Sequence, residues 1–158
     1  MTGTTIVPRP LFPPTARTYA WKGLARTQRI YEVTEANQVL PRVRRLVSRI
    51  AALSLQLPEL QDEVRIAEYR MRRPSAGSEE ADRYDQSTEA HRSAEEDLAD
   101  AARALDEMGV MLKHPVDGLV DFYSYRDGEL VELCWKLGED RVAHWHRIGE
   151  GFPGRKPL

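Results

Sequence analysis

The sequence predicts an α+β protein: a long antiparallel two-helix, coiled-coil-like hairpin, followed by a small antiparallel β-sheet and an ordered C-terminal tail. Two long segments place apolar residues at alternating spacings of three and four, and a short turn joins them. After Gly109 the pattern changes to short alternating runs separated by turns that contain glycine. We therefore expect a basic, Pro-rich arm at 1–29 and one domain at 30–158, with the hairpin at 34–108 and a β module at 109–158.

The arm has no acidic residue, contains four prolines and shows no period, which is typical of disorder or of an extension ordered by a partner. Eleven acidic residues lie at 79–108, whereas 34–73 holds eight arginines and five acids. A basic segment can indicate a nucleic-acid partner. A basic helix beside an acidic one is the simpler explanation, and because no nucleic-acid-binding motif is present we disfavour that partner.

The first helix is expected to begin at Thr34 as N-cap. Its apolar seam comprises Val39, Val43, Leu46, Ile50, Leu53, Leu57, Leu60, Val64, Ala67 and Met71. Pro41 and Pro58 lie within this segment, so the pattern predicts a break or kink near each.

A turn at 73–78 leads to the second helix, which is expected to end at Gly109. Its seam comprises Tyr84, Ser87, His91, Ala94, Leu98, Ala101, Leu105 and Met108, and is small and polar toward the turn. Two helices alone leave an open side. Either the sheet covers it or a second copy does, as a homodimer with a four-helix arrangement.

Short strands are predicted at 110–112, 118–123, 129–137 and 142–148. Alternation puts Glu132 and Cys134 on one face of the third strand, and His144 with His146 on one face of the fourth. Pairing Trp135 with Trp145 joins these into one polar face. Pairing Leu137 with Val142 instead puts the histidines beside Trp135. We favour the first register because it separates apolar from polar side chains better.

The four polar side chains have the right chemistry for a zinc site: His146, Cys134, Glu132 and His144. The commoner explanation of such a face is that neighbouring carboxylates or water satisfy the histidines. A third alternative is acid–base chemistry by His146 without metal. Catalysis by Cys134 is disfavoured, since a cysteine in the middle of a strand is usually buried and inert.

A small anionic ligand is a separate hypothesis, with basic and aromatic residues of the β module around it. The candidate residues are Asp121, Arg126, Trp135, Trp145 and Arg155. An Asp121 carboxylate paired with Arg126 or Arg155 as a structural link is equally consistent with the pattern.

Several segments resemble an uncharacterised bacterial family called domain of unknown function 2203. They are YEVTEANQVLP at 31–41, GLVDF at 118–122, RDG at 126–128, LCWKLGE at 133–139, WH at 145–146 and GFPGRKP at 151–157. The resemblance covers residues 30–158 and implies a small helical protein with no established activity. It also implies that His146 is a better candidate ligand than His144, a position that is often aromatic in the family, and that Tyr123 stands where proline is usual.

Together these observations favour a non-enzymatic cytosolic binding or assembly module. The hairpin would make oligomer or partner contacts, and the β module would hold a small anionic ligand or a metal such as zinc. One alternative is a metal-dependent hydrolase-like enzyme using Glu132, Cys134 and His146, with Asp121 or Glu139 as base. Another is an RNA- or ribosome-associated factor using the arm. A single cysteine suits a reducing cytosol, and no apolar run predicts a membrane span.

Overall fold

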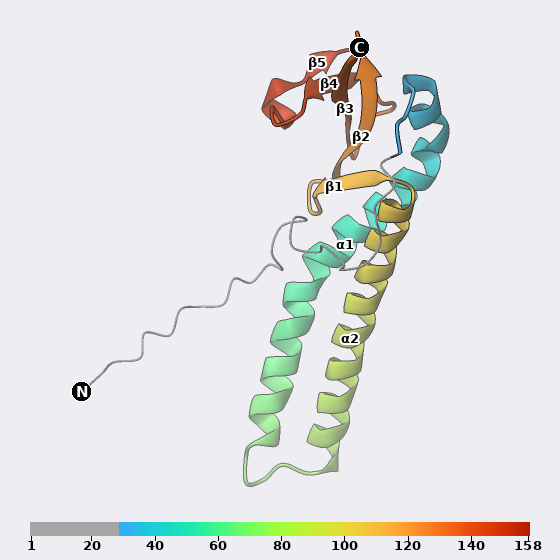
Figure 1. Ribbon diagram of the computed structural model, residues 1–158. Helices are drawn as coiled ribbons and strands as arrows, with labels where there is room; N and C mark the ends of the chain where they lie inside the picture. The colour runs from blue at the N-terminus through green and yellow to red at the C-terminus, as the bar shows by residue number, and fades with distance from the viewer. Residues whose placement is uncertain (1–28) are drawn as a thin grey trace, which may run out of the picture.

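The computed structural model describes residues 29–158 as two long helices followed by a five-stranded antiparallel sheet, which confirms the predicted α+β class (Figure 1). The strands follow the chain in the order β1-β2-β3-β4-β5. The elements are α1 (Val33–Met71), α2 (Ser78–Glu107), β1 (Val110–His114), β2 (Leu119–Arg126), β3 (Glu129–Lys136), β4 (His144–Arg147), a 3₁₀ turn (Phe152–Gly154) and β5 (Lys156–Pro157). The prediction for the arm lies outside the described residues, except at Arg29.

Helix α1 begins two residues earlier than expected, because Glu32 and not Thr34 is the N-cap. The Glu35 carboxylate accepts a hydrogen bond from the Glu32 N–H at 2.9 Å, which satisfies a free donor of the first turn. Neither Pro41 nor Pro58 breaks the helix. Both prolines are exposed on the helix surface. Figure 1 shows α1 changing direction between its blue start and its green remainder.

The hydrophobic core lies where the hairpin meets the sheet. Helix α1 contributes apolar residues at helical spacing, α2 contributes small and apolar residues from its last turns, and the sheet contributes one face. The largest fully buried apolar side chains of the core are Trp135, Tyr31, Phe122, Ile50, Leu105 and Leu133. The sheet therefore caps one end of the hairpin, and the rest of the hairpin projects away from it (Figure 1).

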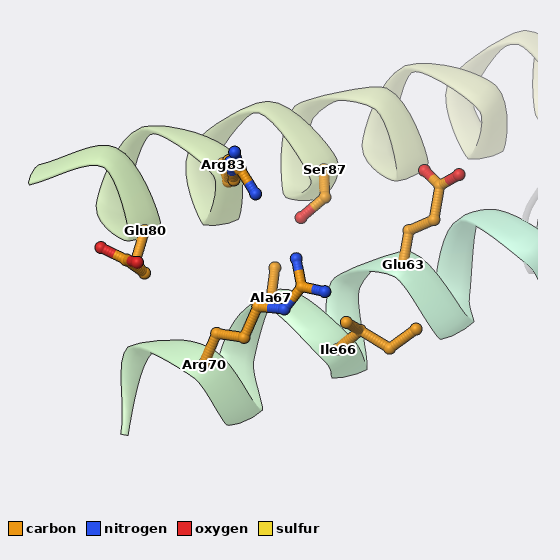
Figure 2. A pocket seen from close by; sticks show the side chains of 7 residues that line it. All are labelled: Glu63, Ile66, Ala67, Arg70, Glu80, Arg83 and Ser87. Carbon is orange, nitrogen blue, oxygen red and sulfur yellow. The ribbon is translucent and has the colours of Figure 1, made fainter. Parts of the chain in front are cut away.

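The distal half of the hairpin is packed less completely. Among the predicted seam residues of α1, Leu53, Leu57, Leu60 and Val64 are only half-buried. An open hollow lies between the two helices near the turn (Figure 2). Its lining residues are Glu63, Ile66, Ala67, Arg70, Glu80, Arg83 and Ser87.

Strand pairing separates an apolar face from a polar one. Phe122 lies opposite Leu133, and Leu133 opposite Trp145, on the face that packs on the helices. On the other face Asp121 lies opposite Cys134, and Cys134 opposite His144. The predicted polar face is therefore present, but the favoured register was wrong by two residues, since Trp145 pairs with Leu133 and not with Trp135.

The register differs because the connection between β3 and β4 is long and fixed by α1. The Asn37 amide oxygen accepts a hydrogen bond from the Val142 N–H at 2.9 Å, and the Asn37 amide nitrogen donates to the Val142 carbonyl at 3.3 Å. The Arg44 guanidinium donates to the carbonyls of Glu139 and Asp140. These contacts hold residues 137–143 as a wide loop in place of the tight turn expected at 138–141. No helix in the described part of the chain is long and apolar enough to cross a membrane.

Candidate functional site

Three side chains that can bind a metal meet on the polar face of the sheet, and we call them the Asp-Cys-His cluster: Asp121, Cys134 and His146. Each comes from a different strand, β2, β3 and β4 respectively. Strand alternation turns all three to the face away from the helices, and antiparallel pairing brings the strands side by side. The fold thus gathers residues that are 13 and 12 positions apart in the chain.

The cluster is compact and closed to solvent. One donor atom from each residue lies within 4.8 Å of the others. The exposed fraction is 2% for Asp121 and 0% for both Cys134 and His146. Such burial is costly for polar groups unless each finds a partner.

Two atoms of the cluster lack a hydrogen-bond partner among the described residues: Asp121 Oδ1 and His146 Nε2. The opposite ring nitrogen, His146 Nδ1, lies 3.0 Å from the Arg147 carbonyl oxygen, which can only accept a hydrogen bond. Nδ1 therefore carries the hydrogen, and in the neutral ring Nε2 presents its lone pair toward Asp121 Oδ2, 3.4 Å away. The Lys113 ammonium group lies 3.4 Å from the same Oδ2, whereas Nε2 has no hydrogen-bond partner among the described residues. Fixing Nδ1 on a carbonyl is also how proteins orient a histidine that binds metal through Nε2.

A buried carboxylate and an ammonium group border the cluster. Glu132 is 4% exposed, and its Oε2 lies 3.4 Å from His146 Nδ1. Lys113 Nζ lies 2.8 Å from Glu132 Oε1 and 3.4 Å from Asp121 Oδ2. Lys113 reaches this place because the β1–β2 pairing shifts between Leu112 and His114, and this bulge leaves Lys113 without an opposite residue.

Burial dominates the electrostatics of the cluster. Desolvation raises the pKa of Asp121, although the Cys134 thiol, His146 and Lys113 all favour its ionised form. Desolvation and the neighbouring Asp121 carboxylate raise the pKa of the Cys134 thiol. Burial would lower the pKa of Lys113, but Glu132 and Asp121 outweigh it and the pKa of Lys113 is raised. A raised thiol pKa is the opposite of what a nucleophilic cysteine needs.

The structure separates the four predicted zinc ligands. Cys134 and His146 come together with Asp121, while Glu132 contacts the other side of the imidazole and bonds to Lys113. His144 belongs to a neighbouring group: Arg155 Nη2 lies 3.0 Å from His144 Nδ1 and 2.7 Å from Glu139 Oε2. Arg155 also donates to the Cys134 carbonyl at 3.2 Å, so this group fastens the C-terminal tail to β3.

The five residues proposed for an anionic ligand do not converge. Trp135 is fully buried against the helices, and its indole N–H donates to the Glu139 carbonyl at 2.9 Å. Trp145 lies on the same face, with the Arg126 guanidinium over its ring at 4.9 Å. Asp121 lies on the opposite face, and Arg155 contacts the Cys134 carbonyl and Glu139. The geometry therefore offers no shared pocket to this set.

Sequence reasoning missed Lys113, and it placed Asp121 among the anionic-ligand residues or as a base and not among the metal ligands. The signal for Asp121 was available, since a carboxylate among Leu119, Val120 and Phe122 must face a buried partner. Lys113 gave no signal, because the bulge that places it is not visible in the apolar pattern.

Comparison with known families shows to which family the chain belongs. Residues 29–158 match the model of DUF2203, described as an uncharacterized conserved protein. The chain belongs to the DUF2203 family. No curated protein and no solved structure matches it. For this DUF2203 member, functional inference therefore rests on the geometry of the Asp-Cys-His cluster.

Proposed function

We propose that this protein is a non-enzymatic, cytosolic binding module whose sheet holds a transition-metal ion, with zinc as the first candidate. The observation that carries the proposal is the pair of buried atoms without hydrogen-bond partners, His146 Nε2 and Asp121 Oδ1, beside the Cys134 thiol. A bound cation would give both atoms the partner that residues 29–158 do not supply. Each of these costs about 1–3 kcal/mol when left unsatisfied, so their retention in a small β module favours a role in binding.

The donor set suits zinc better than magnesium or calcium. One sulfur, one imidazole nitrogen and one carboxylate oxygen are the ligand types that zinc accepts, whereas the hard cations prefer oxygen alone. Asp121, Cys134 and His146 would hold the ion, and the ion would tie β2, β3 and β4 together. The chemistry supplied by the metal would be this cross-strand link.

A metal-dependent hydrolase is the second candidate, and one observation favours it. Three protein ligands leave a position for water, as in catalytic zinc sites. The closed environment argues against it, because all three ligands are at most 2% exposed and a substrate has no route to them. We therefore expect zinc-loaded protein to show no hydrolysis of ester and phosphodiester substrates above the His146→Ala background, and hydrolysis that depends on His146 would reverse the ranking.

The hairpin would supply the assembly part of the function by pairing with a second copy of the chain. Its distal half exposes Leu55, Ile66 and Tyr69. The nearby hollow carries two acidic and two basic side chains, so the same surface can complement itself in an antiparallel pair (Figure 2). Sedimentation equilibrium of wild type and Ile66→Glu tests this, and a wild-type monomer at all concentrations contradicts it.

Elemental analysis of purified, untagged protein tests the metal proposal directly. We expect close to one zinc per chain in the wild type and loss of zinc in His146→Ala. His144→Ala is the matched control, because His144 contacts Arg155 and lies outside the Asp-Cys-His cluster. Cobalt substitution adds a second readout, since thiolate coordination by Cys134 gives a charge-transfer band. Equal zinc content in wild type and His146→Ala would contradict the assignment.

A further inference from the structure

Lys113 borders the Asp-Cys-His cluster and reaches solvent. Its side chain is 37% exposed, against 3% for Asp121 and 5% for Glu132. The bulge in β1 places it there, and its ammonium group contacts both carboxylates. Lys113 therefore lies between the buried ligands and the surrounding water.

The ammonium group and a metal ion would share one carboxylate. Asp121 Oδ2 lies 3.4 Å from Lys113 Nζ and also 3.4 Å from His146 Nε2. A divalent ion bound to Asp121 and His146 would thus lie close to the lysine charge, and the two cations repel each other strongly in a buried site. Glu132 gives Lys113 a second partner at the shorter distance of 2.8 Å, so the ammonium group can leave Asp121 without losing its ion pair.

We propose that Lys113 is a built-in counter-ion of the metal-free site, which neutralises Asp121 and closes the cluster until a metal ion displaces it toward Glu132. This inference rests on the proposed metal site and concerns its regulation. Lys113 sets how tightly and how fast the site takes up metal, and it keeps two buried carboxylates compensated when no metal is bound.

Removal of the lysine charge tests the proposal, because zinc affinity should then rise and not fall. The variants are Lys113→Met, which keeps the length of the side chain, and Lys113→Gln, which keeps a donor for Glu132. Each is titrated with zinc against a chromophoric chelator, and uptake is followed by stopped flow. We expect zinc to bind about tenfold more tightly or better in both, since the competing charge is gone. Lys113→Arg should stay near wild type.

Lys156→Met is the matched control, because Lys156 lies on β5, contacts Glu150, and should leave zinc affinity unchanged. Denaturant unfolding adds an independent readout. Without metal, Lys113→Met should unfold more readily than wild type, and saturating zinc should remove the difference.

The two proposals fail in distinguishable ways. Zinc binding that depends on His146, with equal or weaker affinity in both neutral Lys113 variants, would overturn the counter-ion role and leave the metal site intact. Absence of zinc binding in wild type and in both variants would overturn the metal site and the counter-ion role together.

Discussion

Replacing Asp121 by asparagine should make the metal-free protein more stable while removing its response to zinc. The asparagine amide nitrogen can donate to His146 Nε2, and its oxygen can accept from the Cys134 thiol. The substitution therefore satisfies a buried atom that has no hydrogen-bond partner in the wild type, and it removes a buried charge. It leaves no charge stranded, because Lys113 is half-exposed and keeps its bond to Glu132 at 2.8 Å.

The expected magnitude follows from the group relieved. Satisfying one buried polar atom is worth about 1–3 kcal/mol, and the lost contact between Lys113 and Asp121 at 3.4 Å offsets part of it. We expect a net gain of about 1 kcal/mol in the free energy of unfolding, or about 3–5 °C in Tm for a domain of this size. With zinc at 100 times its Kd the wild type should gain about 2.7 kcal/mol, and Asp121→Asn should gain nothing.

The pH dependence provides a second measurement on the same variant. Because the folded-state pKa of Asp121 is raised, the folded protein binds this proton more tightly than the unfolded chain. The contribution of Asp121 to the free energy of unfolding is therefore fully present below its unfolded-state pKa of about 3.9, and it is lost as pH rises through its folded-state pKa. Asp121→Asn should remove this slope from urea unfolding of the chelated protein. A loss of more than about 1 kcal/mol at neutral pH would refute the reasoning, because it would make Asp121 a structural ion-pair partner.

Two further substitutions test the supports around the cluster. Glu139→Gln should cost about 1 kcal/mol at neutral pH, since it breaks the 2.7 Å bond to Arg155. Burial opposes ionisation of Glu139, but Arg155 and the Lys136 N–H outweigh it, so its pKa is lowered. The stability that ionised Glu139 provides is present above its unfolded-state pKa and is lost as pH falls through its folded-state pKa. The urea unfolding curves of wild type and Glu139→Gln should therefore converge in acid. Curves that stay parallel would exclude an ionised pair. Asn37→Ala should cost about 1–3 kcal/mol, because the Val142 N–H and carbonyl both lose their partner. It should also weaken zinc binding, and unchanged affinity would show that the loop and β4 are independent.

The sequence was sufficient for both helices and for β1 to β4, because each has its own local signal, whereas β5 (Lys156–Pro157) was not predicted. Seam residues such as Val43 and Ile50 repeat at helical spacing, and the run from Glu129 alternates as a strand should. Alternation was also enough to put Glu132 with Cys134 on one face of β3, and His144 with His146 on one face of β4, but whether these faces coincide depended on the register. Predicting which residues lie opposite each other across the strands required the register. The register depends on the contact between Val142 and Asn37, which lies about a hundred residues earlier in the chain.

The composition of the cluster was harder to predict for a related reason. Zinc motifs are usually recognised by short spacings within a turn. Here the distances along the chain are set by the lengths of two strand connections, so the ligands form no local motif. Glu132 satisfied strand alternation as well as Asp121 did, and only the cross-strand geometry distinguishes them. The bulge at Lys113 depends on pairing between strands, which a single sequence does not display.

The attachment of α1 to the loop before β4 couples the position of the hairpin to the position of β4. The first turns of α1 hold this loop through Asn37 and Arg44, and the loop leads directly into the strand that carries His146. A partner that bound the far end of the hairpin and tilted α1 would shift this loop and, through it, β4. Partner binding at the hairpin would then change how tightly the Asp-Cys-His cluster binds a metal, and force applied to the helices would release the metal.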